Sequence, residues 1–262
     1  MSTPLLFSVV DGVGEIVLNR PDAGNAFDEP MLDAWVAALQ QCLADDAVRA
    51  VLLRANGRHF CAGGDLHDMK RELEGPPSIH KTKLWSGVHR IPKLMMQIDK
   101  PVVAAMQGAA TGAGLDMALQ CDFRVAADNA RVAASYVKIG LVPGDGGAWL
   151  LPRIVGLPRA LDMLLTGDFV EAAEGQRIGL FNRVVPLADL ENEARALAHR
   201  LADGAATAMR LTKRAAYQGL HLDFTTHLDQ ISSHFVLAAK SPEHREGVTA
   251  FLEKRKPTFT GE

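Results

Sequence analysis

The chain has 262 residues, 48% of them hydrophobic and 23% charged, with a formal net charge of −3. This composition is ordinary for a globular protein, and its slightly acidic balance argues against a protein that coats nucleic acid. The sequence contains no apolar run long enough to span a bilayer, no signal peptide and no CxxC pair among its three cysteines. We therefore expect a soluble cytoplasmic protein with reduced thiols.

The first elements predicted are a β-hairpin and a long helix. Residues 5–10 and 14–19 are strand-like and flank Asp11-Gly12, a strong signal for a tight turn. Apolar residues at helical spacing then predict an amphipathic helix over 29–44. Strand, helix and strand in this order indicate a mixed α/β architecture.

The next segments predict a strand, a loop and a helix. Residues 48–53 are a compact apolar strand. Residues 74–81 are predicted to be a mobile loop, because Gly75 and the pair Pro76-Pro77 disfavour regular structure. A helix over 82–98 should follow.

Residues 101–126 form the central stretch of the sequence. A buried strand over 102–105 leads into a glycine-rich turn, which is followed by a helix carrying Asp116 and by a strand over 123–127. Because glycine allows a backbone to approach a ligand closely, this turn could present free amide groups to an oxyanion. The loop at 61–66 (CAGGDL) has the same form. Each loop could equally be an ordinary turn between a strand and a helix.

The last part of the chain becomes increasingly helical. Short strands are predicted within 131–142 and at 184–185, and helices at 149–154, 158–165, 171–178, 194–202, 205–217, 222–239 and 243–254. The change in composition predicts an α/β core over residues 1–200 and a helical region over residues 201–262.

Five motifs in order give the sequence a family resemblance. They are NRPDAGNAF (19–27), FCAGGDL (60–66), GAATGAGLDMALQCDFRVA (108–126), GLVPGDGGAWLLPRIVG (140–156) and FLEKRKPTF (251–259). Together they resemble the crotonase, or enoyl-CoA hydratase/isomerase, superfamily. The resemblance implies an α/β fold, a spiral of repeated ββα units, with a helical C-terminal trimerisation region. It also implies a homotrimer or homohexamer that needs no cofactor and uses a coenzyme A thioester as substrate.

The resemblance implies that two backbone amides bind the thioester oxygen and stabilise an enolate. Matched motif to motif, these amides belong to Gly64 and Ala113. Removing one donor from a site of this kind typically raises a barrier by about 3 kcal/mol. The implied activity is hydration or double-bond isomerisation of an enoyl-CoA in fatty acid metabolism. The alternatives are acyl-CoA decarboxylation, thioester hydrolysis, and a non-catalytic binding protein such as the RNA-binding relatives.

The acid–base positions depart from the hydratase pattern. Enoyl-CoA hydratases use two glutamates that activate one water, and here Asp116 and Tyr136 occupy those two places. Tyrosine, with an ordinary pKa near 10, is a poor base at neutral pH. Asp145 lies in a turn where some relatives place a catalytic acid, so we predict Asp116 and Asp145 as the catalytic pair. Asp145 could instead cap the helix that begins near Gly146.

Recognition of coenzyme A rests on weaker matches. The positions that the resemblance assigns to substrate or coenzyme A are Ala23, Ala62, Asp65, Leu66, Tyr136, Phe251 and Lys254. Two basic residues that often contact the phosphates are replaced by Asp22 and His67. The cluster of His59, Cys61, Asp65 and His67 reflects loop crowding rather than a metal site.

Overall fold

The computed structural model describes residues 3–72 and 75–259. Its strands are β1 (Leu5–Val10), β2 (Val13–Leu18), β3 (Ala50–Ala55), β4 (Val102–Met106), β5 (Ala109–Thr111), β6 (Phe123–Ala127), β7 (Arg131–Ala133), β8 (Val170–Glu171) and β9 (Arg183–Val185). Its α-helices are α1 (Glu29–Ala44), α2 (Leu66–Glu72), α3 (Pro77–Thr82), α4 (Arg90–Met95), α5 (Ala113–Leu119), α6 (Gly147–Val155), α7 (Leu157–Thr166), α8 (Ala172–Arg177), α9 (Leu190–Ala202), α10 (Ala206–Gly219), α11 (Phe224–Ala239) and α12 (Pro242–Leu252).

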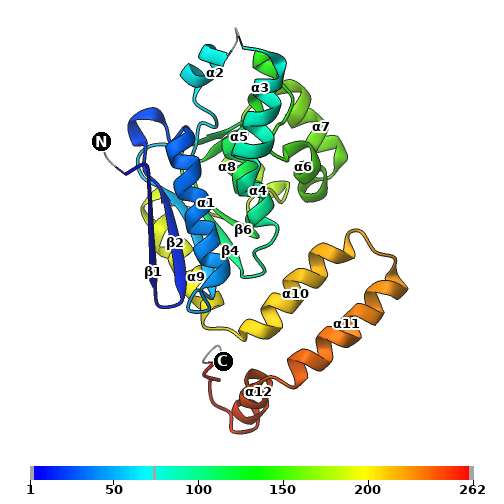
Figure 1. Ribbon diagram of the computed structural model, residues 1–262. Helices are drawn as coiled ribbons and strands as arrows, with labels where there is room; N and C mark the ends of the chain where they lie inside the picture. The colour runs from blue at the N-terminus through cyan, green and yellow to red at the C-terminus, as the bar shows by residue number, and fades with distance from the viewer. Residues whose placement is uncertain (1–2, 73–74, 260–262) are drawn as a thin grey trace.

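A mixed sheet forms the centre of the molecule (Figure 1). Its strand order is β1-β2-β3-β4-β6-β9, with β1 antiparallel to β2 and the other neighbours parallel. A smaller sheet has the order β5-β7-β8. The order β-β-α recurs as β1-β2-α1 and β4-β5-α5. The fold is therefore α/β, as the sequence predicted.

Helices cover both faces of the large sheet. Side chains alternate along a strand, so Ala50 and Leu52 of β3 face one side while Val51 and Leu53 face the other. The first side packs against α9, and the second packs against a larger core that includes Trp35 of α1. Because α5 is buried over its whole length within this larger core, any polar group it carries is removed from bulk solvent.

Several predicted elements are confirmed. The hairpin β1–β2 turns at Asp11 and Gly12, whose positive φ values of 47° and 78° suit the turn type that Asp-Gly favours. Helix α1 spans Glu29–Ala44 as predicted, and the carboxylate of Asp28 caps it by accepting from the amide of Met31.

The predicted loop over residues 74–81 is wrong for most of its length. Residues 77–82 form α3, because a proline in the first turn of a helix needs no amide hydrogen. Residue 74 lies outside the described residues. The helix predicted over 82–98 is divided into a π-helical segment, Lys83–Val88, and α4. Strand β5, which has three residues and lies inside the glycine-rich turn, was not predicted.

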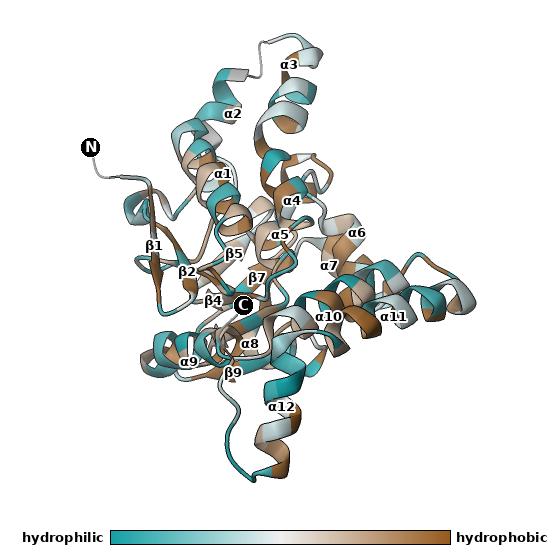
Figure 2. Cartoon of the chain, turned by 60° about the horizontal axis from the view of Figure 1, so that its bottom comes forward, coloured by the Kyte–Doolittle hydropathy of each residue, from teal (hydrophilic) through white to brown (hydrophobic). Residues whose placement is uncertain are grey.

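Helices α10, α11 and α12 form an arm that extends away from the sheet (Figure 1). Large apolar side chains are exposed along this arm, and Figure 2 shows hydrophobic stretches on α11 and α12. They include Phe224, Leu228, Phe235, Val236, Leu237, Val248, Phe251 and Leu252. The helices of the described segments include none with the length and apolarity required to cross a bilayer.

Candidate active site

The two glycine loops pair with each other through their backbones. The amide of Cys61 donates to Ala109 O at 3.2 Å, and the amide of Thr111 donates to Cys61 O at 3.0 Å. The helix that follows packs directly on this pair, because a Cβ at Gly114 would lie 2.2 Å from Cys61 O. Only glycine satisfies that contact. The loops are thus one rigid unit, although their sequences are almost 50 residues apart.

This unit places the loop that carries Gly64 against Ala113, the residue of the second predicted amide donor. Gly63 has a φ of 92°, and a Cβ there would lie 3.3 Å from the amide nitrogen of Ala113. The carbonyl of Gly63 accepts from the amide of Phe27 at 2.9 Å, which holds the first loop in place. Within residues 3–72 and 75–259, the amides of Gly64 and Ala113 have no hydrogen-bond acceptor. Both are therefore available to an oxygen of a ligand.

Two side chains of the cluster attributed to loop crowding, His59 and Cys61, help to hold these loops. His59 Nδ1 accepts from the amide of Ala109 at 3.1 Å, and Cys61 Sγ donates to Asn25 O at 3.1 Å. The first contact joins the two loop regions to each other, and the second joins the first loop to the segment before α1.

Three ionisable side chains from three elements meet beyond this unit. Asp116 lies on α5, one turn after Ala113, and Asp145 lies in the turn before α6. Tyr136, in the 3-10 helix Ser135–Ile139, places its hydroxyl between them. The hydroxyl oxygen is 2.9 Å from Oδ2 of Asp116 and 3.1 Å from Oδ2 of Asp145. The structure thus joins the two predicted acids through the tyrosine.

Burial dominates the electrostatics of this cluster. Asp116 is fully buried, and Asp145 and Tyr136 are exposed by 5% and 9%. Desolvation raises the pKa of Asp116 to about 7, although its hydrogen bond with Tyr136 opposes the shift. Desolvation also raises the pKa of Asp145, and it raises the pKa of Tyr136 above its ordinary value, an effect that the two carboxylates increase. Near neutral pH the tyrosine keeps its proton, and the carboxyl group of Asp116 titrates.

One oxygen of each carboxyl group lacks a hydrogen bond of ordinary geometry, although backbone amides near Asp116 lower its pKa and Nε2 of His89 lies 3.9 Å from Asp145. Oδ1 of Asp116 and Oδ1 of Asp145 are buried, and neither has a hydrogen-bond partner in the described part of the chain. A buried polar atom without a partner is costly, so these atoms are candidates for contact with a substrate. Helix α6 approaches closely, because a Cβ at Gly147 would lie 2.2 Å from Oδ1 of Asp116.

The alternative role of Asp145 as a helix cap is wrong. The residue at the N-cap position of α6 is Gly146, and no side chain accepts a capping hydrogen bond there. The carboxyl group of Asp145 points to Tyr136 instead, because the glycines of the turn leave its side chain free to turn into the core.

His89 is a member of this cluster that the sequence did not reveal. Its Nε2 donates to Gly144 O at 2.7 Å and lies 3.9 Å from Oδ1 of Asp145. The charge of His89 lowers the pKa of Asp145, which partly offsets the effect of burial. A single histidine 56 residues before Asp145 carries no local signal, so only the fold places it here.

The positions assigned to coenzyme A fall into two groups. Ala23 and Ala62 lie close together, because the amide of Ala62 donates to Gly24 O at 2.9 Å. Asp65 follows Gly64 and pairs with Arg20 at 3.4 Å. Leu66 is the first residue of α2. This first group borders the paired glycine loops.

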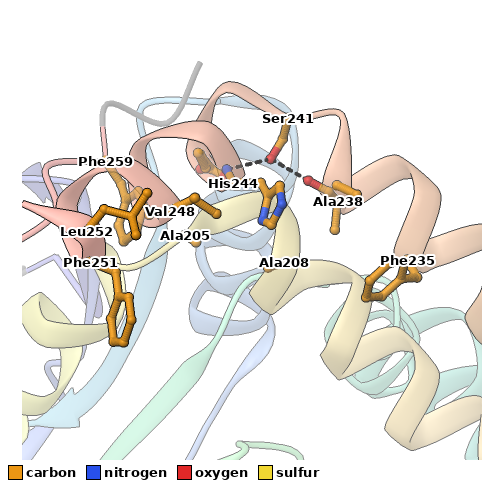
Figure 3. Close-up of a pocket in the computed structure, with 13 residues that line it drawn as sticks. Ala205, Ala208, Phe235, Ala238, Ser241, His244, Val248, Phe251, Leu252 and Phe259 are labelled. Carbon is orange, nitrogen blue, oxygen red and sulfur yellow. Dashed lines mark hydrogen bonds between the residues drawn. The ribbon is translucent and has the colours of Figure 1, made fainter.

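The second group lies on the arm. Phe251 is 82% exposed near the end of α12, and Lys254 follows with a φ of 55°. Phe251 lines an apolar groove of about 500 Å³ between α10, α11 and α12 (Figure 3). Within one chain, α12 lies far along the arm from α5 and α6 (Figure 1), so the structure does not bring these two residues to Asp116.

Comparison with known proteins identifies the family to which the chain belongs. Residues 9–262 match the family model described as "Enoyl-CoA hydratase/isomerase". The chain is 36% identical to 1,2-epoxyphenylacetyl-CoA isomerase of Escherichia coli over 257 residues, which are 98% of each chain. It is 35% identical to crotonyl-CoA hydratase of Syntrophomonas wolfei over 245 residues, 93% of each chain. The crystal structure of a Mycobacterium abscessus protein superposes with a TM-score of 0.96 at 34% identity, covering 98% of this chain and 100% of the other. The chain therefore belongs to the enoyl-CoA hydratase/isomerase (crotonase) family and is an enzyme of that family.

Proposed function

We propose that the protein isomerises the double bond of an enoyl-CoA, moving it between the 3,4 and 2,3 positions. The amides of Gly64 and Ala113 bind the thioester oxygen, Asp116 removes a proton from C2, and Asp145 delivers a proton to C4. The observation that carries this proposal is the hydroxyl of Tyr136 between two buried carboxyl groups.

The paired amides make the first step feasible. Removing a proton from C2 of a thioester places negative charge on the thioester oxygen, and two fixed N–H donors stabilise that charge where it develops. Because the amides of Gly64 and Ala113 belong to one rigid unit, they need no reorganisation during the reaction. This arrangement would serve any reaction of the family that passes through an enolate.

The acid–base cluster favours isomerisation over hydration. Hydration needs a base that takes a proton from water, and Tyr136, in the place of the second hydratase glutamate, keeps its own proton at neutral pH. Isomerisation needs one proton acceptor and one proton donor, which Asp116 and Asp145 supply. A raised pKa suits both roles: that of Asp116 lies at about 7, and that of Asp145 is shifted upward from its ordinary value.

The experiment that tests the proposal compares initial rates on a panel of coenzyme A esters. The panel contains 2-enoyl, 3-enoyl, saturated and malonyl-type esters of several chain lengths. We expect 3-enoyl esters to be isomerised faster than 2-enoyl esters are hydrated. Hydration at an equal or higher rate would overturn the proposal, as would turnover of the malonyl-type ester alone.

The proposed binding of coenzyme A uses both groups of residues. Ala23, Ala62, Asp65 and Leu66 lie beside the amide unit, and Phe251 and Lys254 lie on the arm. We assign the nucleotide end to these positions and no further cofactor to the reaction. The protein is also proposed to be cytoplasmic, which its free, buried cysteines support.

The arm supports a homotrimer or homohexamer. Exposed apolar side chains gathered on one part of the chain are characteristic of an association surface. We expect light scattering to give three or six times the mass of one chain, and Leu237→Asp, at a position 60% exposed on α11, to lower that mass. The control is Val10→Asp, at a position 55% exposed on β1. A monomeric wild-type protein would contradict the proposal.

A further inference from the structure

The hydroxyl of Tyr136 fixes the number of protons in the cluster. It has one hydrogen to donate, yet its oxygen lies within hydrogen-bond distance of both Asp116 and Asp145. If both carboxyl groups were ionised, one of the two contacts would set an oxygen lone pair against a carboxylate. Both contacts are favourable only when one carboxyl group is protonated and donates to the tyrosine oxygen. The cluster is therefore a chain of acid, hydroxyl and carboxylate.

This hydrogen-bonded chain matters because isomerisation by two carboxyl groups leaves each of them in the opposite protonation state from the one that the next turnover needs. After one turnover Asp116 holds the proton taken from C2, and Asp145 has lost its proton to C4. A second turnover in the same direction needs the opposite arrangement. Exposures of 0% for Asp116 and 5% for Asp145 restrict exchange with bulk water. The inference below rests on the proposed function.

We propose that Tyr136 resets the enzyme by relaying a proton from Asp116 to Asp145. The hydroxyl gives its hydrogen to Oδ2 of Asp145 as it receives the hydrogen of Asp116 on its oxygen. Two O–H bonds form and two break, and the negative charge passes from Asp145 to Asp116. No phenolate is formed, and no co-reactant is needed. Tyr136 touches neither reacting carbon and acts only through the two carboxyl groups.

Backbone contacts on Tyr136 fix the position of its side chain. Tyr136 sits in a short 3-10 helix whose carbonyls accept from Gly140 and Leu141, and the amide of Leu141 donates to Tyr136 O at 3.0 Å. On the other side, a Cβ at Gly112 would lie 3.8 Å from the tyrosine ring, so the backbone before α5 packs against it. These contacts fix the ring, and hence the hydroxyl, between the two carboxyl groups.

The test follows deuterium into C4 of the product. The enzyme is equilibrated in D₂O and mixed with an unlabelled 3-enoyl-CoA, first with enzyme in excess and then with substrate in excess. With enzyme in excess, the product should carry deuterium at C4, supplied by Asp145. With substrate in excess, the relay returns each substrate proton to Asp145. The two deuterons of the chain are then used up in two turnovers, and later products should carry hydrogen.

The variants separate the relay from a structural role. Tyr136→Phe removes only the hydroxyl, so solvent must reset the enzyme, and every product should carry deuterium under both conditions. The matched control is Tyr217→Phe, which removes the other tyrosine hydroxyl of the chain, a partly buried group that donates to Asp122 at 2.9 Å and is not part of the cluster. Its label pattern should equal that of the wild type.

Three results would overturn the relay. Deuterium in the product through many wild-type turnovers would mean that solvent resets the enzyme. Hydrogen at C4 with enzyme in excess would mean that one carboxyl group carries the same proton from C2 to C4. An unchanged label pattern in Tyr136→Phe would exclude the hydroxyl. The wild-type pattern decides the question even if that variant does not fold, and a failure to isomerise any 3-enoyl-CoA would instead refute the proposed function.

Discussion

Asp116→Asn should lose isomerase activity and gain stability at alkaline pH. The amide cannot accept the C2 proton, so kcat should fall by about 10²- to 10⁴-fold, the usual contribution of a general base. Binding of a saturated acyl-CoA should persist, because the amides of Gly64 and Ala113 are untouched. Initial rates and calorimetric binding measure the two effects.

The gain in stability follows from the pKa of Asp116. Burial raises that pKa from the ordinary 3.8 to about 7, so between these values the folded state binds more protons than the unfolded state. Stability of the wild type therefore falls as pH rises through this window, while asparagine contributes no such loss. At about 1.4 kcal/mol per pKa unit, the variant should be more stable by about 2 to 4 kcal/mol at pH 8. Urea unfolding at pH 4 and pH 8 measures the difference.

The control for this variant is Asp168→Asn. Asp168 has a side chain that is 76% exposed and pairs with Lys138 on the surface. Its replacement should alter neither the activity nor the dependence of stability on pH. Isomerase activity that survives Asp116→Asn would exclude Asp116 as the base, and an unchanged pH profile would mean that its carboxyl is solvated in the folded protein.

Ala113→Pro should remove one of the two proposed oxyanion donors without unfolding the protein. Ala113 is the first residue of α5, where proline is well tolerated because its missing hydrogen has no partner within the helix. Gly112 before it has φ 52° and ψ −124°, a conformation open to glycine and extended enough to precede proline. Loss of one such donor lowers kcat by about 10²- to 10³-fold.

The matched variant Ala113→Gly keeps the amide hydrogen and changes only the side chain. It should retain much more activity than Ala113→Pro. Circular dichroism and thermal unfolding confirm that both variants are folded. Equal losses in the two variants would mean that the methyl group matters and that the amide of Ala113 does not bind the thioester oxygen.

Much of the fold followed from local signals in the sequence. The Asp11-Gly12 turn and the helical spacing of apolar residues in α1 are patterns between residues close in sequence. The hairpin β1–β2 and helix α1 were therefore predicted correctly. Short elements that depend on distant partners were missed. Strand β5 has only three residues and exists because it pairs with β7 and with Cys61. Helix α3 was mistaken for a loop because proline was weighed without its position in the helix.

The candidate site divides in the same way. Motif positions indicated Asp116, Tyr136 and Asp145 separately. For Asp145 the sequence was equally compatible with a catalytic acid and with a helix cap. Only the folded chain shows that the tyrosine lies between the two acids and that His89 lies beside one of them. From the sequence alone, Tyr136 was interpreted as the replacement of a catalytic base. In the structure, its hydroxyl instead connects the carboxyl groups of Asp116 and Asp145. Such contacts between residues of different elements produce no periodicity or spacing in the sequence, so they could not be predicted from it.

The most direct test of this account is turnover of a 3-enoyl-CoA in water enriched in ¹⁸O, analysed by mass spectrometry of the initial products. If a proton moves between two carbons through Asp116 and Asp145, the first product is a 2-enoyl-CoA that contains no ¹⁸O. An initial product that is a 3-hydroxyacyl-CoA carrying ¹⁸O would show that the site adds water, and would contradict the account.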